Sequence, residues 1–292
     1  MNKEKILGIL KSKVFNKVHI DKIIIVGKIV LIVFVILSAI GLWIEVGSQL
    51  LMKDKDLLGK PCYKNGDIAT IEIRGEIVPY FLYDSDGNKP DDSKGYDAVS
   101  SEEVVACIND IKYDDDMEGV IVEIDSRGGS PFASEEIMKA IKRLNKPTAA
   151  VIRESATSGG YLIASATDRI FASDFSDIGG IGVTMSYLDY SQKNEADGIT
   201  YQQISSGKFK DAGDPDKPLT DEEWELLMRD TELMHAMFTA NIAANRDLDI
   251  EKVIKLADGS SMLGEMAKEN GLIDEIGDRN SAEKWLTSNP MY

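Results

Sequence analysis

The spacing of hydrophobic residues changes several times along this chain, and each change predicts a different element. Apolar and β-branched residues alternate with polar ones over 67–78, as in a strand with one buried face. Compact apolar runs at 119–125 and 147–153 predict two buried strands. Helical spacing follows over 100–114, behind a serine cap and an acidic first turn, and again within 126–146. This alternation predicts an α/β fold with a mostly parallel sheet and right-handed crossovers.

The second half of the chain continues the pattern with shorter strands. Short apolar runs predict three of them, at 169–173, 181–186 and 200–205. Residues 219–246 have the spacing of one long amphipathic helix. Thr220 is its expected cap, and Glu223 follows three residues later, which is the spacing of a capping box. Short helices are predicted through 261–277.

An apolar run near the N-terminus is long enough to cross a membrane. Residues 23–46 are almost entirely apolar, and no residue from Ile29 to Ile44 is charged. About 20 such residues span a bilayer core. The first 45 residues carry seven lysines against three acidic residues, and a basic flank of this kind stays cytoplasmic. The run exceeds that of a secretory signal and lacks a good cleavage site, so an uncleaved signal anchor is favoured over a cleaved peptide.

These features predict a single-pass protein of the cell membrane. Its expected parts are a cytoplasmic basic segment at 1–22, a transmembrane signal anchor at 23–46, a linker at 47–66 and an extracytoplasmic domain at 67–292. The formal net charge is −17. An acidic body argues against nucleic acid as a partner, since phosphate binding needs a basic surface.

The cysteines and histidines do not form a metal-binding pattern. No cluster of Cys and His is present in the sequence, so neither a metal nor another cofactor is predicted. Cys107 lies on the apolar side of a predicted helix, where a thiol behaves as a small buried hydrophobe. Cys62 lies near the expected exit from the membrane. An extracytoplasmic location permits a disulfide, but the pairing stays open at this point.

Two glycine-rich turns follow two adjacent predicted strands. The first is "DSRGGSP" at 125–131, and the second is "SATSGGY" at 155–161. Since sites in α/β sheets form at the carboxyl ends of strands, both turns are expected to lie side by side. One turn can supply an oxyanion donor, and the other can supply Ser158 as a nucleophile with a second donor, which is a constellation for acyl transfer. The alternative is that both are ordinary turns, in which glycine serves packing.

A serine nucleophile needs a base, and histidine is the usual one. His19 precedes the membrane segment and is expected in the cytoplasm, while His235 lies in the middle of the long helix as a packing or surface residue. A lysine can serve instead when burial lowers its pKa from about 10.4 to about 7–8. The segment 204–220 contains "SGKFKD", with Lys208 and Lys210. Composition alone does not decide between a general base and a basic surface loop.

Four segments, in order along the chain, resemble one family of bacterial enzymes. They are "VEIDSRGGSPFASEEI", "TSGGYLIASATDRIFA", "SGKFKDAGDPDKPLTDEEW" and "DGSSMLGEMAKENGLIDEIG". They resemble the oxyanion, nucleophile, lysine and C-terminal segments of the signal peptide peptidase A family, which are membrane-anchored Ser–Lys serine proteases. The resemblance extends from about Ile68 to Gly277.

The resemblance implies a role for each matching residue. Ser158 is the implied nucleophile, Lys210 the general base, and Gly129 and Gly159 the oxyanion donors, with Gly128 shaping the turn. The implied fold is the Clp-protease/crotonase-like α/β fold. The implied assembly is a homo-oligomeric ring in which neighbouring subunits supply the serine and the lysine, as in the short members of the family. The sequence leaves open the ring size and whether the pair forms within or between chains.

Two residues depart from the family pattern. Arg127 stands where proline is usual in the first glycine turn, and its charge is expected to affect substrate preference near the cleft. Gly180 stands where a serine is common, whose hydroxyl can orient the lysine amine. Ser155, Thr157 or a water molecule could take that role. Slower catalysis is the expected consequence, and Gly180→Ser is the variant that suggests itself as a test.

The predicted function is that of a membrane-anchored serine endopeptidase with a Ser158–Lys210 dyad. Its expected substrates are extended peptides, such as remnant signal peptides or misfolded membrane and secreted segments. A crotonase-type acyl-CoA enzyme has the same implied fold, but an extracytoplasmic location disfavours it because CoA is cytosolic. The other alternative is a non-catalytic, membrane-anchored binding or assembly protein with a degenerate site, which the missing hydroxyl at Gly180 supports.

Overall fold

The computed structural model describes residues 61–81 and 97–288. The predicted cytoplasmic segment, the signal anchor and most of the predicted linker lie outside the described residues. Within the described ranges, no helix combines the length and the apolar character that a membrane crossing requires. The predicted anchor at 23–46 therefore stays a prediction.

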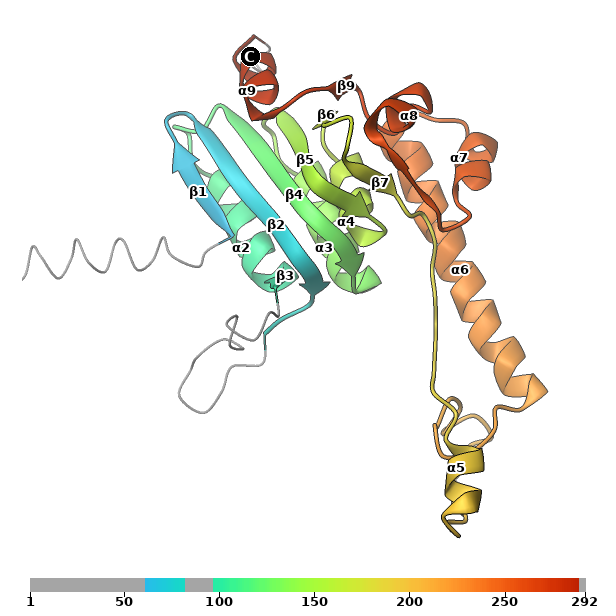
Figure 1. The fold of residues 1–292 in the computed structure, drawn as a ribbon. Helices are drawn as coiled ribbons and strands as arrows, with labels where there is room; N and C mark the ends of the chain where they lie inside the picture. The colour runs from blue at the N-terminus through green and yellow to red at the C-terminus, as the bar shows by residue number, and fades with distance from the viewer. Residues whose placement is uncertain (1–60, 82–96, 289–292) are drawn as a thin grey trace, which may run out of the picture. The chain divides into compact units, whose positions relative to one another are not determined.

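One sheet organises the described chain. Its central strands are β2 (Ile68–Val78), β4 (Gly119–Gly129), β5 (Thr148–Thr157) and β6 (Arg169–Ala172). These four strands are parallel neighbours in that order, which confirms the predicted α/β fold with a mostly parallel sheet (Figure 1). Shorter strands extend the sheet: β1 (Cys62–Asn65), β3 (Ala98–Ser100), β7 (Asp177–Gly179), β8 (Ser261–Leu263) and β9 (Glu275–Ile276). Of these, β1 and β8 run antiparallel to their neighbours.

Helices cover both faces of the sheet, unequally. The helices are α2 (Ser101–Lys112), α3 (Pro131–Lys142), α4 (Gly159–Ser165), α5 (Ser191–Ala196), α6 (Asp221–Arg246), α7 (Ile250–Leu256), α8 (Gly264–Glu269) and α9 (Arg279–Ser288). The first three, with the C-terminal half of α6, contribute to the large hydrophobic core on one face. On the other face α9 packs Ala282 and Leu286 over a smaller apolar cluster that includes Ile121 and Val151.

The predicted helix starts are confirmed. The Ser100 hydroxyl accepts a hydrogen bond from Glu103 N at the start of α2. Thr220 and Glu223 form a reciprocal capping box at the start of α6. Each cap satisfies backbone N–H groups that have no partner inside the helix, so the two helices begin where the sequence predicts.

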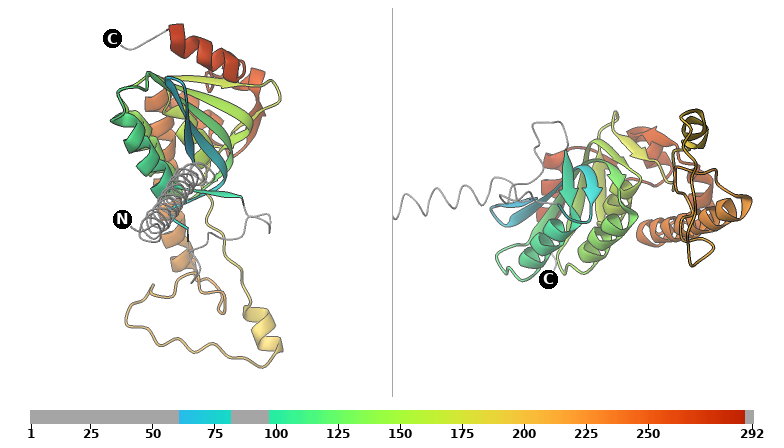
Figure 2. Two further views of the ribbon diagram at one scale, coloured as in Figure 1. Left: turned by 90° about the vertical axis from the view of Figure 1, so that its left-hand side faces the viewer. Right: turned by 90° about the horizontal axis from the view of Figure 1, so that it is seen from below.

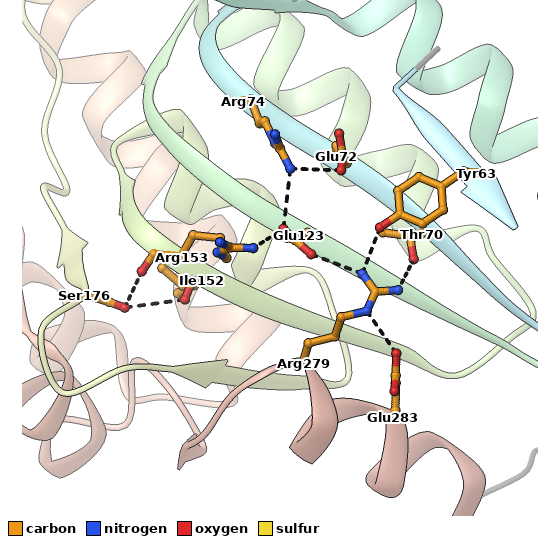
Figure 3. Close-up of polar contacts among 10 residues, drawn as sticks. All are labelled: Tyr63, Thr70, Glu72, Arg74, Glu123, Ile152, Arg153, Ser176, Arg279 and Glu283. Carbon is orange, nitrogen blue, oxygen red and sulfur yellow. Dashed lines mark hydrogen bonds and ion pairs between the residues drawn. The ribbon is translucent and has the colours of Figure 1, made fainter. Parts of the chain in front are cut away.

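A buried carboxylate fixes α9 to the sheet. Glu123 on β4 is only 4% exposed, and a buried charge needs partners. Arg153 Nη1 donates to Glu123 Oε1 at 2.7 Å, and Arg279 Nη1 of α9 donates to Glu123 Oε2 at 3.1 Å (Figure 3). Arg279 also donates to Thr70 and to the Tyr63 hydroxyl. One guanidinium therefore joins β1, β2, β4 and α9.

The prediction of a linker up to residue 66 is wrong for Cys62–Asn65, which form β1. Asn65 pairs with Ile68, so Gly66 and Asp67 make a two-residue hairpin loop, and Gly66 has φ +67°. Gly followed by Asp between two strands is a signal for a two-residue hairpin loop. The strand itself is short and polar, and its placement depends on long-range partners.

One of those partners is a disulfide. Cys62 on β1 is bonded to Cys107 on α2, 45 residues away. The pairing that the sequence leaves open is therefore present in the structure, and the prediction that Cys107 is buried is confirmed. The bond attaches β1 to the helical layer, while Arg279 attaches it to α9 on the opposite face.

Two predicted strands are absent from the described residues. Residues 181–186 run without strand partners, and the strand in this region is β7, just before them. Residues 200–205 also form no strand, and most of them are exposed. Both segments have apolar residues. A strand, however, also needs a neighbouring strand to pair with, and neither segment pairs with a described strand of the same chain.

Removal of the disulfide is expected to lower the stability of the domain. Closing a loop of this length restricts the unfolded chain by about 4 kcal/mol on the chain-entropy estimate. The Cys62→Ser/Cys107→Ser variant should lose a large share of that free energy of unfolding, measured by urea denaturation. A reducing agent should destabilise the natural protein equally and leave the variant unchanged. Equal stability of oxidised and reduced protein would contradict a structural role for the bond.

Candidate active site

The two glycine turns lie against each other at the carboxyl ends of β4 and β5, as predicted. A Cβ built on Gly128 would lie 2.7 Å from Gly159 N and 2.9 Å from Ser158 Cβ. Gly128 also has φ +98°, which L side chains rarely adopt. The turn after β4 can therefore approach the turn after β5 only because residue 128 has no side chain.

Ser158 occupies a strained position between β5 and α4. Its φ is +51° and its ψ is −124°, and the only other non-glycine residue with positive φ in the described chain is Asp247. Ser158 N donates to Gly179 O at 2.8 Å, which ties the serine backbone to β7. Strain of this kind persists only where the surroundings enforce it, and it is concentrated at functional sites. The residue is half-buried, and its side chain caps no N–H group of α4.

The predicted oxyanion donors flank this serine. Gly159 is the first residue of α4, where an N–H group has no carbonyl partner within the helix. Gly129 ends β4, and the next residue, Ser130, donates its N–H to Ile77 O at 2.8 Å. Gly129 and Gly159 both line a cavity together with Ser158. The structure thus brings together Ser158, Gly128, Gly129 and Gly159.

Two cavities, each of about 400 Å³, open on Ser158. The first, called the apolar cavity, has walls from α3, α4 and α6 that include Phe132, Leu162, Met237 and Phe238. The second, called the polar cavity, is lined by Ser158, Gly180, His235, Ala257, Asp258 and Gly259, and by 182–184. Ser158 and residues 182–184 belong to both cavities, so they form the wall between them.

Lys210 is not beside Ser158 within one chain. It lies in an exposed turn of the arm, defined as residues 185–219, which carries α5 and leaves the sheet before α6 returns (Figures 1 and 2). Tyr201 and Gln203 both donate to Asp211 and hold this turn. Lys208 pairs with Glu222, but no described residue forms an ion pair or hydrogen bond with the Lys210 amine.

The residues proposed to compensate for Gly180 lie in different places. Ser155 is buried, and its hydroxyl has no hydrogen-bond partner among the described residues. Thr157 lies beside Gly180, because a Cβ at Gly180 would come within 2.9 Å of Thr157 Cβ. Arg127 lines a separate cavity of about 560 Å³ with Glu76, Asp97, Asp125 and Glu154, and Ser158 does not line that cavity.

His235, predicted as a packing or surface residue, is half-buried in the structure. The structure adds that it lines the polar cavity together with Ser158. Its Nε2 lies 3.0 Å from Ala257 O. The neighbouring Met234, Met237 and Phe238 line the apolar cavity, so this part of α6 forms a wall of the site. Helical spacing identifies a buried face, but it does not indicate which cavity that face borders.

A strained serine at the end of a parallel strand, packed against a glycine turn of the neighbouring strand, is an arrangement that suits attack on acyl groups. The model of peptidase family S49 matches residues 140–290. A Methanocaldococcus jannaschii protein that is named as a protease is 34% identical over 88% of this chain and 80% of its own length. An Enterococcus faecium protein named as a signal peptide peptidase SppA is 36% identical over 57% of this chain and 49% of its own length.

The chain belongs to peptidase family S49, with the signal peptide peptidase A proteins. Its class is therefore that of a serine protease. Among solved structures, a mutant ClpP1 of Listeria monocytogenes aligns with 73% of this chain and 92% of that chain, at 16% identity and a TM-score of 0.46.

Gly128→Ala is expected to abolish activity by forcing the two turns apart. The added Cβ meets backbone atoms of Gly159, which cannot move without displacing Ser158. Gly198→Ala is the matched control, because Gly198 also has positive φ (+72°) but has open space around it. The control should lose about 1–2 kcal/mol of stability at most and keep its peptidase activity. Retained turnover in Gly128→Ala would contradict the close approach of the turns.

Gly180→Ser is expected to give no gain in turnover. Gly180 has φ +56°, and the new Cβ would lie 2.9 Å from Thr157 Cβ. The substitution should therefore cost about 1–2 kcal/mol of stability in addition to the steric conflict. Gly180→Ala adds the same Cβ without the hydroxyl, so the ratio of the two kcat values isolates the hydroxyl. A serine variant faster than the natural protein would overturn this expectation.

Proposed function

We propose that this protein is a membrane-anchored serine endopeptidase in which Ser158 is the nucleophile and Lys210 of a neighbouring chain is the general base. The observation that carries the proposal is the strained Ser158, which lies in the second glycine turn, packs against the first and lines two cavities. Lys210 lies on the arm and lines neither cavity. A lysine base at Ser158 would therefore come from the arm of a neighbouring chain.

The proposed reaction has two halves. In the first, the Lys210 amine takes the proton from Ser158 Oγ as this oxygen attacks the peptide carbonyl. The N–H groups of Gly129 and Gly159 donate hydrogen bonds to the oxyanion that forms. The C–N bond then breaks, and the lysine ammonium returns its proton to the leaving amine. In the second half, water attacks the acyl-enzyme ester and releases Ser158 with the same proton transfers.

The two cavities support an extended peptide as the substrate. The apolar cavity lies on the side of the oxyanion donors and is lined by Phe132, Leu162, Met237 and Phe238, so it suits an apolar side chain before the scissile bond. The polar cavity lies across the wall formed by residues 182–184, where the leaving amine and its proton donor would meet. Residues 182–184 have no strand partner of their own and can pair with an added strand.

Exposed apolar residues support assembly into a homo-oligomer. On the first half of α6, Trp224 is 60% exposed and Leu233 is 57% exposed. The arm adds exposed Leu188 and Ile204. Apolar groups gathered on one part of a surface mark an interaction site. A neighbouring body packed against the arm would bury Lys210 and favour its uncharged amine, which a general base requires.

The disulfide supports an extracytoplasmic location. Disulfides persist in oxidising compartments and are rare in the cytosol. The Cys62–Cys107 bond lies at the beginning of the described domain, directly after the part of the chain that carries the predicted anchor. Substrates would then be peptides at the outer side of the membrane, with remnant signal peptides as one source.

The dyad is tested by single substitutions in the full chain, assayed with a fluorogenic peptide that has an apolar residue before the cleavage site. Ser158→Ala and Lys210→Ala should each lower kcat by about 10⁴-fold or more. Lys208→Ala is the matched control on the same turn and should keep activity within a few-fold. Full activity in Lys210→Ala would sink the dyad, and an inactive natural protein would favour the non-catalytic alternative.

Mixing the two inactive variants tests whether the dyad forms between chains. Co-expressed Ser158→Ala and Lys210→Ala chains should recover about a quarter of the natural activity, because random mixing pairs the two intact residues at one interface in four. A dyad within one chain would give no recovery. Co-purification of the untagged chain through an affinity tag carried only by the other chain confirms that the two chains co-assemble.

A further inference from the structure

We propose that His235 positions the Lys210 amine at Ser158 and so takes the role that a hydroxyl at residue 180 would have. This inference rests on the proposed Ser158–Lys210 dyad. It concerns a residue on the packed body, in the chain that supplies the serine. His235 would act through the lysine, so it is a positioning residue and not the base itself.

The polar cavity is where a lysine amine can reach Ser158 and find polar partners. The apolar cavity is walled mainly by aromatic and aliphatic side chains. Of its polar lining residues, Glu135 already pairs with Lys139, and the Ser134 hydroxyl already donates to Ser130 O. In the polar cavity, the ionisable side chains among the described lining residues are His235 and Asp258. Gly180 also lines this cavity and offers no side chain.

The orientation of the imidazole leaves one ring nitrogen without a hydrogen-bond partner among the described residues. A carbonyl oxygen only accepts hydrogen bonds, so the 3.0 Å contact means that His235 Nε2–H donates to Ala257 O. In the neutral imidazole the other nitrogen, Nδ1, is then an acceptor. A neutral lysine amine can donate one N–H group to Nδ1. The lone pair of the amine nitrogen can then face Ser158 Oγ.

Backbone hydrogen bonds tie this imidazole to the nucleophile. Ser158 N donates to Gly179 O at 2.8 Å, and Gly180 N donates to Ser260 O at 3.0 Å. Gly259 N donates to Ile181 O at 3.1 Å. The loop 257–260, whose Ala257 carbonyl anchors His235, is therefore bonded to the segment that holds Ser158. A positioning group needs this kind of fixed support.

Asp258 is the other polar side chain in the cavity, and its geometry suits it less. Its Oδ1 already accepts hydrogen bonds from the Ser260 N–H at 2.9 Å and from the Ser260 hydroxyl at 2.5 Å. These bonds hold the pKa of the Asp258 carboxyl below its usual range. A carboxylate would also favour the charged ammonium, which cannot act as a base.

The first test compares variants of His235 in the full-length enzyme. His235→Phe keeps a ring of similar size without polar atoms, and His235→Gln keeps a donor for Ala257 and an acceptor. The phenylalanine variant should lower kcat about 10- to 100-fold with KM unchanged within a few-fold. The glutamine variant should recover most of that loss. Glu232→Gln, an exposed residue of the same helix, is the control.

The second test uses the chain that carries the substitution. In mixed assemblies, active sites combine Ser158 of the Lys210→Ala chain with Lys210 of the Ser158→Ala chain. His235→Phe should remove the recovered activity when it is placed in the Lys210→Ala chain, and should have no effect in the Ser158→Ala chain. A folding or assembly defect would lower activity in both placements, so the comparison separates positioning from structure.

Each other outcome counts against the proposal. Unchanged kcat in His235→Phe overturns it, and equal losses in the phenylalanine and glutamine variants indicate a merely structural role. A loss in Asp258→Asn or Thr157→Val without one in His235→Phe assigns the positioning to that residue instead. If Lys210→Ala stays active while His235→Phe is inactive, the imidazole is the base, and the dyad itself fails. If mixing restores no activity, the comparison of phenylalanine with glutamine still decides the role of His235.

Discussion

The contact between two glycine turns is the constraint on which the rest of the site depends. Gly128 lies so close to Gly159 and Ser158 that any side chain at residue 128 would overlap them. This contact holds the ends of β4 and β5 together at the point where the serine backbone adopts positive φ. The positions of Ser158, of both expected oxyanion donors and of the wall between the cavities all follow from the path that the chain takes there.

The site is divided between a packed body and an extended arm. Ser158 and its neighbours are fixed by a sheet that is buried on one face and partly covered on the other. Lys210 lies in a turn that polar contacts hold together and that has few buried residues. In the proposed dyad, the body supplies the serine and the arm of a neighbouring chain supplies the lysine, so assembly would complete the catalytic centre.

The sequence predicts the parts of the fold that depend on local pattern. The strands at β2, β4 and β5 are confirmed, as are the caps at Ser100 and Thr220, because apolar periodicity and capping residues act within a few positions. β1 was missed because it is short and polar, and because its support comes from a disulfide and from Arg279, which are distant in sequence. Periodicity carries no information about such partners.

The sequence also predicts those parts of the candidate site that depend on local pattern. The two turns and Ser158 follow from glycine placement after buried strands, and the structure brings them together. Lys210 rests on family resemblance, since no single-chain contact draws it to the serine. The place of His235 at the polar cavity could not be predicted, because a residue in the middle of a helix gives no sign of the cavity beside it. Local pattern places neither residue in the site, because the groups around each of them come from distant parts of the chain or from another chain.

The attachments of β1 determine how the domain resists force. β1 is an edge strand paired antiparallel with β2, and a strand of this kind can be peeled away one hydrogen bond at a time. Here its first residue is covalently joined to α2, and Tyr63 is held by Arg279 of α9. A pull on the chain before residue 61 would therefore load both layers of the domain at once.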